Sequence, residues 1–205
     1  MLTSKIRKIA REQIKKGGLF VVARYDDYHI MVIMSRLIAI ITPADYLKFV
    51  QPVTKRKPPP ENELFQLSGN MNLTVDDWKA WVRKHSHATS QGILTPYIRR
   101  FQKNKEIHEL HIIATEEGPW YCDRKFLDCF VTDHNTRVEI IDTKTKVLKF
   151  HNFNDKGGFI AYIGPTLLTP SPREAIQISA MAIEEKQKGG VANVNLRPSP
   201  MPCLS

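Results

Sequence analysis

The sequence lacks the features that mark several large classes of protein. Its three cysteines do not form a disulfide scaffold, because Cys122 and Cys129 share one face of an expected helix about 10 Å apart, too far to bridge. No apolar run approaches the length of a membrane span, and the basic first eighteen residues lack the apolar core of a secretory signal. We therefore expect free thiols, no membrane partner and a cytoplasmic location.

Recognisable catalytic and metal-binding motifs are also missing. There is no P-loop, dinucleotide fingerprint or nucleophile elbow. Two close pairs of histidines could ligate zinc, but the spacing is not that of H-E-x-x-H, and on a strand the second pair points to opposite faces. The pairs are His85 with His87 and His108 with His111. The sequence therefore predicts no cofactor and favours a protein that is not an enzyme.

One enzymatic alternative stays open. His87-Ala88-Thr89 and His134-Asn135-Thr136 are two H-x-T triplets. They resemble the triplets of the two-histidine phosphoesterases, in which paired acid–base histidines cleave phosphodiesters. In that family the triplets lie on hydrophobic strands, whereas here both lie in polar, turn-rich sequence. The alternative function is thus a phosphodiesterase that uses His87 and His134.

Acidic residues are scarce in the first quarter of the chain. Residues 1–57 contain twelve lysines and arginines against four acidic residues, a net charge of +8 out of +9 for the whole chain. Such an excess favours a polyanionic partner, with nucleic acid as the leading candidate. The alternative is a protein-interaction module whose charge serves solubility.

The main structural pattern is a helix followed by three strands, which occurs twice. In residues 4–41 a basic helix with Ser4 as N-cap has a buried stripe of Ile6, Ile9, Ala10 and Ile14, ends at Gly17-Gly18 and leads into three apolar strands. In residues 118–164 Asp123 caps a helix that carries Cys122, Phe126, Cys129 and Phe130 on one face. Three strands follow it, and the uncharged FIAYIG should be central in its sheet.

The region between the two halves is less regular. Three consecutive prolines make residues 51–62 an exposed linker. Thr74 caps a helix with Trp78, Trp81 and Val82 on one face. Residues 93–107 are ambiguous, with a short helix after Pro96 as one interpretation. Residues 172–188 should form an amphipathic helix, and the proline-rich residues 189–205 should be a disordered tail.

These two halves resemble the DNA sliding clamps, which repeat a helix followed by strands with pseudo-twofold symmetry. The resemblance is carried by KIRKIAREQIKKGGLFVVARYDDYHIMVI and by WYCDRKFLDCFVTDHNTRVEIIDTKTKVLKFHNFNDKGGFIAYIG. It implies a diverged, single-domain relative, of phage or mobile-element type, that acts in DNA replication. In clamps the helices line a central hole and offer cations to DNA phosphates. Carried over, that role falls to Lys5, Lys8, Arg11, Lys15, Arg124 and Lys125.

The expected fold class is α+β, with two helix-plus-three-strand halves forming a clamp-like domain of antiparallel sheets with helices on one side. Residues 1–188 should be a single domain, with 52–105 as an inserted or linking segment. The expected function is that of a non-enzymatic nucleic-acid-associated protein, a diverged sliding-clamp-like DNA-binding or processivity factor. The expected partners are duplex DNA, bound without sequence preference, and further copies of the chain.

Overall fold

The structure, a computed structural model, describes residues 2–34, 36–103, 105–133, 135–142, 147–154 and 157–166, together with residues 168, 175, 176, 178, 180 and 184. The helices are α1 (Lys5–Lys15), the consecutive turns α2 (Pro43–Asp45), η1 (Tyr46–Val50) and α3 (Gln51–Thr54), then α4 (Val75–Lys84) and α5 (Arg124–Leu127). The strands are β1 (Phe20–Tyr25), β2 (Tyr28–Ile33), β3 (Leu37–Ile41), β4 (Leu64–Ser68), β5 (Ser90–Lys103), β6 (Glu106–Thr115), β7 (Gly118–Asp123), β8 (Arg137–Asp142), β9 (Val147–Asn154) and β10 (Gly157–Ile163).

All of these strands join one antiparallel sheet in the order β4-β1-β2-β3-β10-β9-β8-β5-β6-β7. The order helix and then three strands occurs twice, as α1-β1-β2-β3 and as α5-β8-β9-β10. The two sets meet where β3 pairs with β10, from Leu37 opposite Ile163 to Ile40 opposite Ile160. The fold is therefore α+β, as predicted, and β10 is the central strand that its uncharged sequence indicated.

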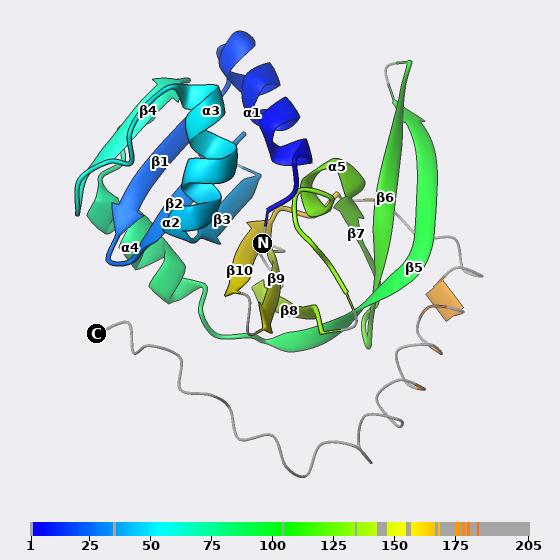
Figure 1. The fold of residues 1–205 in the computed structure, drawn as a ribbon. Helices are drawn as coiled ribbons and strands as arrows, with labels where there is room; N and C mark the ends of the chain where they lie inside the picture. Colours follow the sequence, from blue (N-terminus) through cyan, green and yellow to red (C-terminus); the bar gives the residue numbers. More distant parts are fainter. Residues whose placement is uncertain are drawn as a thin grey trace.

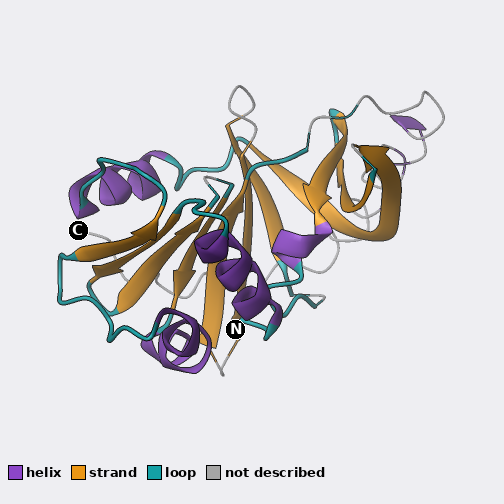
Figure 2. Cartoon of the chain, turned by 90° about the horizontal axis from the view of Figure 1, so that it is seen from above, coloured by secondary structure: helices purple, strands orange, loops and turns teal. Residues whose placement is uncertain are grey.

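Helices cover both sides of this sheet (Figure 2). On one side, α1, η1 and α5 share a core with alternate strand residues such as Met31 and Phe150. On the other side, α4 packs through Trp78 and Val82 onto the intervening residues, such as Val32. Strands buried on both faces need apolar residues at every position, which explains why β2 and β10 show no polar alternation.

The two long helices begin differently. In α4, the Thr74 hydroxyl accepts a hydrogen bond from Asp77 N, and the Asp77 carboxylate accepts one from Thr74 N, which completes a capping box. In α1, Ser4 makes no such side-chain bond. The α1 stripe is nevertheless as expected, with Ile6, Ile9 and Ala10 buried; Gln13 is buried as well, and Ile14 is only half-buried. Gly17, at φ +67°, ends the helix in a left-handed conformation.

Several predictions were wrong. The two halves form one continuous sheet rather than adjoining sheets, and helices lie on both sides because α4 covers the opposite face. Residues 93–103 and 105–107 lie in the β5–β6 hairpin rather than in a helix. Pro96 lies at a register irregularity between Leu94 and Ile98. The pairing of β5 with β6 is interrupted there, so the missing N–H of proline removes no hydrogen bond between the strands. In the linker, Gln51–Thr54 is helical, and Pro59 is buried rather than exposed.

The second helix is shorter than expected. It spans only Arg124–Leu127, and strand β7, which was not predicted, precedes it. The long β5–β6 hairpin projects beyond α5, so that α5 lies between this hairpin and α1 (Figure 1). The expected tail and most of the expected helix at 172–188 lie outside the described residues.

Candidate nucleic-acid interface

The outer face of α1 carries three of the six cations predicted to contact DNA. Lys8, Arg11 and Lys15 are exposed, and they follow one another at spacings of three and four residues, which places them on one arc of the helix. The structure gives none of the three an ion-pair partner among the described residues. The inner stripe packs on the sheet and fixes this arc toward solvent. We call these three residues the outer face of α1.

A second helical segment lies beside α1 on the same side of the sheet (Figure 1). It consists of α2, η1 and α3, and it is followed by a basic run. Its four lysines and arginines are all exposed: Lys48, Lys55, Arg56 and Lys57. Ten of the twelve lysines and arginines in residues 1–57 therefore belong to α1 and the residue after it, or to this second segment and the basic run that follows it.

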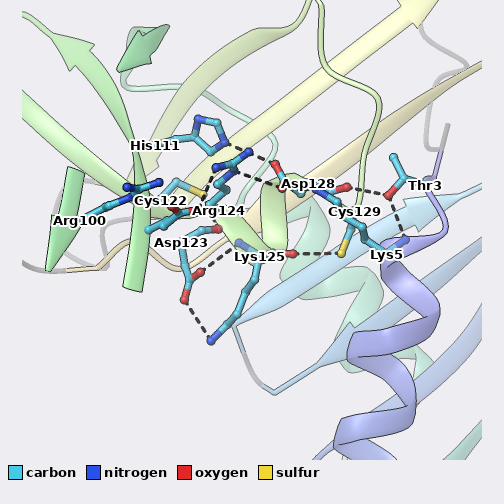
Figure 3. Close-up of polar contacts among 11 residues, drawn as sticks. Thr3, Lys5, Arg100, His111, Cys122, Asp123, Arg124, Lys125, Asp128 and Cys129 are labelled. Carbon is cyan, nitrogen blue, oxygen red and sulfur yellow. Dashed lines mark hydrogen bonds and ion pairs between the residues drawn. The ribbon is translucent and has the colours of Figure 1, made fainter. Parts of the chain in front are cut away.

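The other three predicted cations have acidic partners (Figure 3). Lys5 pairs with the Asp128 carboxylate, and Arg124 pairs with Glu109 at 2.8 Å and with Asp128 at 3.3 Å. Lys125 lies 3.0 Å from Asp123. Since each positive charge has a carboxylate within contact distance, these residues are poorly suited to holding DNA phosphates. The six predicted cations thus form two groups. Lys8, Arg11 and Lys15 have no ion-pair partner among the described residues, and Lys5, Arg124 and Lys125 are paired with carboxylates.

Two of these three cations, Lys5 and Arg124, belong to a network that we call the α5 corner. Its members are Lys5, Arg100, Glu109, His111, Arg124 and Asp128. It joins α1 and α5 to the β5–β6 hairpin, because Lys5 pairs with Asp128 and Arg124 pairs with Glu109 on β6. Within the hairpin, Glu109 also accepts a hydrogen bond from Arg100 at 2.7 Å. His111 Nε2 lies 3.6 Å from Asp128. Near it, Thr3 N donates to Cys129 O at 2.7 Å, and the Thr3 hydroxyl donates to Asp128 O at 2.6 Å. The corner is therefore a structural clasp between the two halves.

The electrostatics of the α5 corner keep its carboxylates charged. Burial acts to raise the pKa of Asp128, but the hydrogen bond and charge of Lys5, the charge of Arg124 and the hydrogen bond of His111 lower it below its usual value. The Glu109 pKa is lowered mainly by its hydrogen bond with Arg100. Burial lowers the pKa of His111 despite the nearby Asp128. Near neutral pH the corner therefore holds ionised carboxylates that compete with any phosphate.

The thiols beside this corner are not reactive groups. Cys122 and Cys129 are free and buried. Burial raises the pKa of the Cys122 thiol and raises that of Cys129 to about 12. A thiolate is the nucleophile and the metal-binding form, so these side chains serve as small apolar residues in the core.

The H-x-T alternative requires a pair of histidines of which the structure describes only one. His87 is exposed in the turn before β5, and His134 lies outside the described residues. The threonines of both triplets have structural roles: the Thr89 hydroxyl donates to Ile140 O at 2.8 Å, and the Thr136 hydroxyl accepts from Asp133 N at 2.9 Å. These bonds hold the turn at Asp133 and the start of β5, and the phosphodiesterase alternative stays a prediction.

The histidines considered as zinc ligands are not gathered at one place. His85 is buried and stacks on Trp81, with Nδ1 2.7 Å from Trp81 O. His108 stacks on Phe101 in the hairpin, whereas His111 belongs to the α5 corner. No group of three or more potential metal ligands occurs in the described part of the chain.

Sequence reasoning missed a polar cluster on the opposite face of the sheet. Lys149 is buried and lies 2.7 Å from Glu139 Oε2, while His151 Nε2 lies 3.2 Å from Glu139 Oε1. The hydrogen bond with His151 and the interactions with Lys149 lower the pKa of Glu139 to about 2. Lys149 Nζ also donates to Ser86 O at 3.4 Å, which ties the end of α4 to β9. The sequence did contain one indication of this cluster, because Lys149 stands between the core residues Leu148 and Phe150 in an expected strand.

No helix among the described residues is both long enough and apolar enough to cross a bilayer. Comparisons with protein-family models, with curated proteins and with solved structures found no match to this chain.

Proposed function

We propose that this protein is a non-enzymatic nucleic-acid-binding protein that holds duplex DNA through the outer face of α1. The observation that carries the proposal is the state of Lys8, Arg11 and Lys15. They are exposed on one arc and have no ion-pair partner in the described ranges, whereas the cations of the α5 corner have carboxylate partners. Cations arranged in this way attract a phosphate backbone by releasing its condensed counterions.

The proposed binding is independent of base sequence. Lysine and arginine side chains on an outer helix face reach phosphates, which position a protein but carry no sequence information. The only amide side chain in α1 is that of Gln13, and it is buried rather than available to an adenine edge. We therefore expect a dissociation constant in the micromolar range or weaker, on the order of ordinary non-specific binding, and a steep fall of affinity with salt.

A clamp-like role in DNA replication is part of the proposal. It is supported by the repeated order of a helix and three strands and by the position of α1 and α5 on one side of the sheet. In such a role α1 faces DNA, while the clasped α5 contributes structure. Further copies of the chain would be needed to surround a duplex, and solution mass measured with and without duplex DNA tests that part.

The binding proposal is tested by reversing the charge of the outer face. The variant Lys8→Glu/Arg11→Glu/Lys15→Glu alters only exposed side chains, so it should fold normally and lose binding to a labelled duplex at low salt. Wild-type protein should bind at low salt and dissociate at moderate salt. Equal retention of duplex by both proteins, or wild-type binding that does not respond to salt, would contradict the proposal.

A further inference from the structure

We infer that Arg7 and Lys48 form a phosphate-binding seat at the junction of α1 and η1, an inference that rests on the proposed function. The seat is an observed convergence of two cations on one aromatic ring. Arg7 Cζ lies 5.5 Å from the centroid of the Phe49 ring, and Lys48 Nζ lies 5.2 Å from the same centroid. Phe49 itself is 8% exposed and belongs to the core beneath both helices. The two charges are thus held near each other by a rigid part of the fold.

The backbone holds Arg7 in this position. Its Nη2 donates a hydrogen bond to the Lys48 carbonyl at 2.6 Å, which links the side chain of α1 to the main chain of η1. This bond fixes the plane of the guanidinium and leaves further N–H groups on the same planar fork. Lys48 lies in a π-helical turn, a backbone form that occurs often at functional sites. A pre-positioned arginine loses little conformational freedom when it binds an anion.

The charge balance at this junction is the second observation. Neither Arg7 nor Lys48 has an ion pair with a carboxylate anywhere in the portion that the structure describes. In the α5 corner, by contrast, Lys5 and Arg124 come together around the Asp128 carboxylate. Asp45 is buried, and burial raises its pKa while the charge of Lys48 acts to lower it, so this acid interacts with Lys48 without forming an ion pair. Arg7 and Lys48 repel each other, and an anion between them would turn that repulsion into attraction.

The position of the seat extends the outer face of α1 onto the neighbouring segment. Arg7 lies one turn before Arg11, so the two occupy adjacent sites along the helix. On the other side, Lys48 is the first exposed cation of the segment that ends in Lys55, Arg56 and Lys57. The ligand is therefore a backbone phosphodiester of the same nucleic acid, seated between two groups of exposed cations.

The seat is tested by the salt dependence of binding to a labelled duplex. Losing the contact with one phosphate reduces the steepness of log association constant against log salt by about 0.9. We expect this reduction for the double variant Arg7→Gln/Lys48→Gln, and a smaller reduction for each single variant. Lys84→Gln, an exposed lysine at the end of α4 on the opposite face, is the matched control and should leave the slope unchanged.

A second variant separates geometry from charge. Arg7→Lys keeps the positive charge but loses the planar fork that contacts the Lys48 carbonyl, so it should keep the slope and bind several-fold more weakly. Thermal midpoints of all variants establish that each is folded. Unchanged slopes in Arg7→Gln and Lys48→Gln, or wild-type affinity in Arg7→Lys, would overturn the seat. If the seat variants behave like wild type but the charge-reversed α1 variant loses binding, the seat is wrong and the proposed function is retained. If wild-type protein does not bind duplex, the seat and the proposed function are both wrong.

Discussion

The outer face of α1 and the α5 corner contain the same kinds of side chain in opposite electrostatic states. On α1, Lys8, Arg11 and Lys15 face solvent without an ion-pair partner among the described residues. In the α5 corner, Lys5 and Arg124 are held by carboxylates that remain ionised. The difference teaches that a cation is available to a ligand only when the fold has supplied no acid for it.

The comparison also separates two contributions of charge. Exposed cations add little to folding stability, but they determine attraction to polyanions. Paired and partly buried charges do the reverse, because losing one partner leaves the other desolvated and uncompensated. Mutations at the two places should therefore affect different measurements, stability at the corner and binding on α1.

The largest expected effect concerns His29, a buried histidine that stacks on Tyr46 of η1. His29 is 2% exposed, stacks on Tyr46 at 4.8 Å, and has no hydrogen-bond partner for either ring nitrogen in the part of the structure described. Burial, with the charge of Arg24, lowers its pKa to about 4. The unfolded state, with an ordinary value near 6.5, then binds more protons between these two pH values, so stability should fall as pH falls from about 6.5 to 4.

Up to about 3 kcal/mol of unfolding free energy is linked to this proton. Urea unfolding of wild type and His29→Phe at pH 7 and pH 4.5 measures it. The variant should lose less stability on acidification than wild type. Asp128, whose pKa is lowered, contributes stability that is lost only as pH falls below its ordinary value near 3.8, so its contribution should be lost after that of His29. The lowered pKa of His111 means that the corner also loses some stability below about pH 6.5. An equal loss in both proteins would show that His29 does not set the acid limit.

The next effect breaks the α5 corner itself. Asp128→Asn keeps the shape of the side chain but removes the charge that Lys5, His111 and Arg124 share. We expect a loss of about 1–3 kcal/mol of unfolding free energy, measured by urea unfolding at pH 7. Because Lys5 and Arg124 are released, the salt slope of duplex binding should also become steeper. Wild-type stability in this variant would mean that the clasp does not join the two halves.

The smallest effect compares the starts of two helices. Thr74→Ala removes both the cap and its contact with Asp77, and should cost about 1 kcal/mol. Ser4→Ala removes a side chain that makes no cap hydrogen bond, and should change stability by less than about 0.5 kcal/mol. Thermal unfolding of the two single variants side by side measures the difference. A larger loss for Ser4→Ala would indicate that Ser4 caps α1 in solution.

The sequence predicted what depends on local pattern. The stripe of Ile6, Ile9 and Ala10, the cap at Thr74 and the central position of β10 each follow from residues within one element. The partners of the corner could not be predicted in this way, because Lys5 and Asp128 are 123 residues apart and meet only after β3 has paired with β10. Half of the candidate site was therefore assigned to cations that the fold neutralises.

Strand β5 was missed for a different reason. Pro96 and the mixed polar sequence around it argue against a strand when only local propensity is considered. The structure accommodates the proline at a register irregularity, and the Thr95 hydroxyl donates to Ile112 O at 2.8 Å across it. Such a compensating contact involves a residue on the partner strand, and a single-strand pattern does not contain it.

The central claim is that free and paired cations differ in function, and two matched triple variants test it directly. Lys8→Gln/Arg11→Gln/Lys15→Gln neutralises the outer face of α1, and Lys5→Gln/Arg124→Gln/Lys125→Gln neutralises the cations that have acidic partners. The measurement is the slope of log association constant against log salt for one labelled duplex. The first variant should lower the slope by about 2.7, and the second should leave it unchanged while lowering the thermal midpoint. An equal decrease in the two variants would contradict the account.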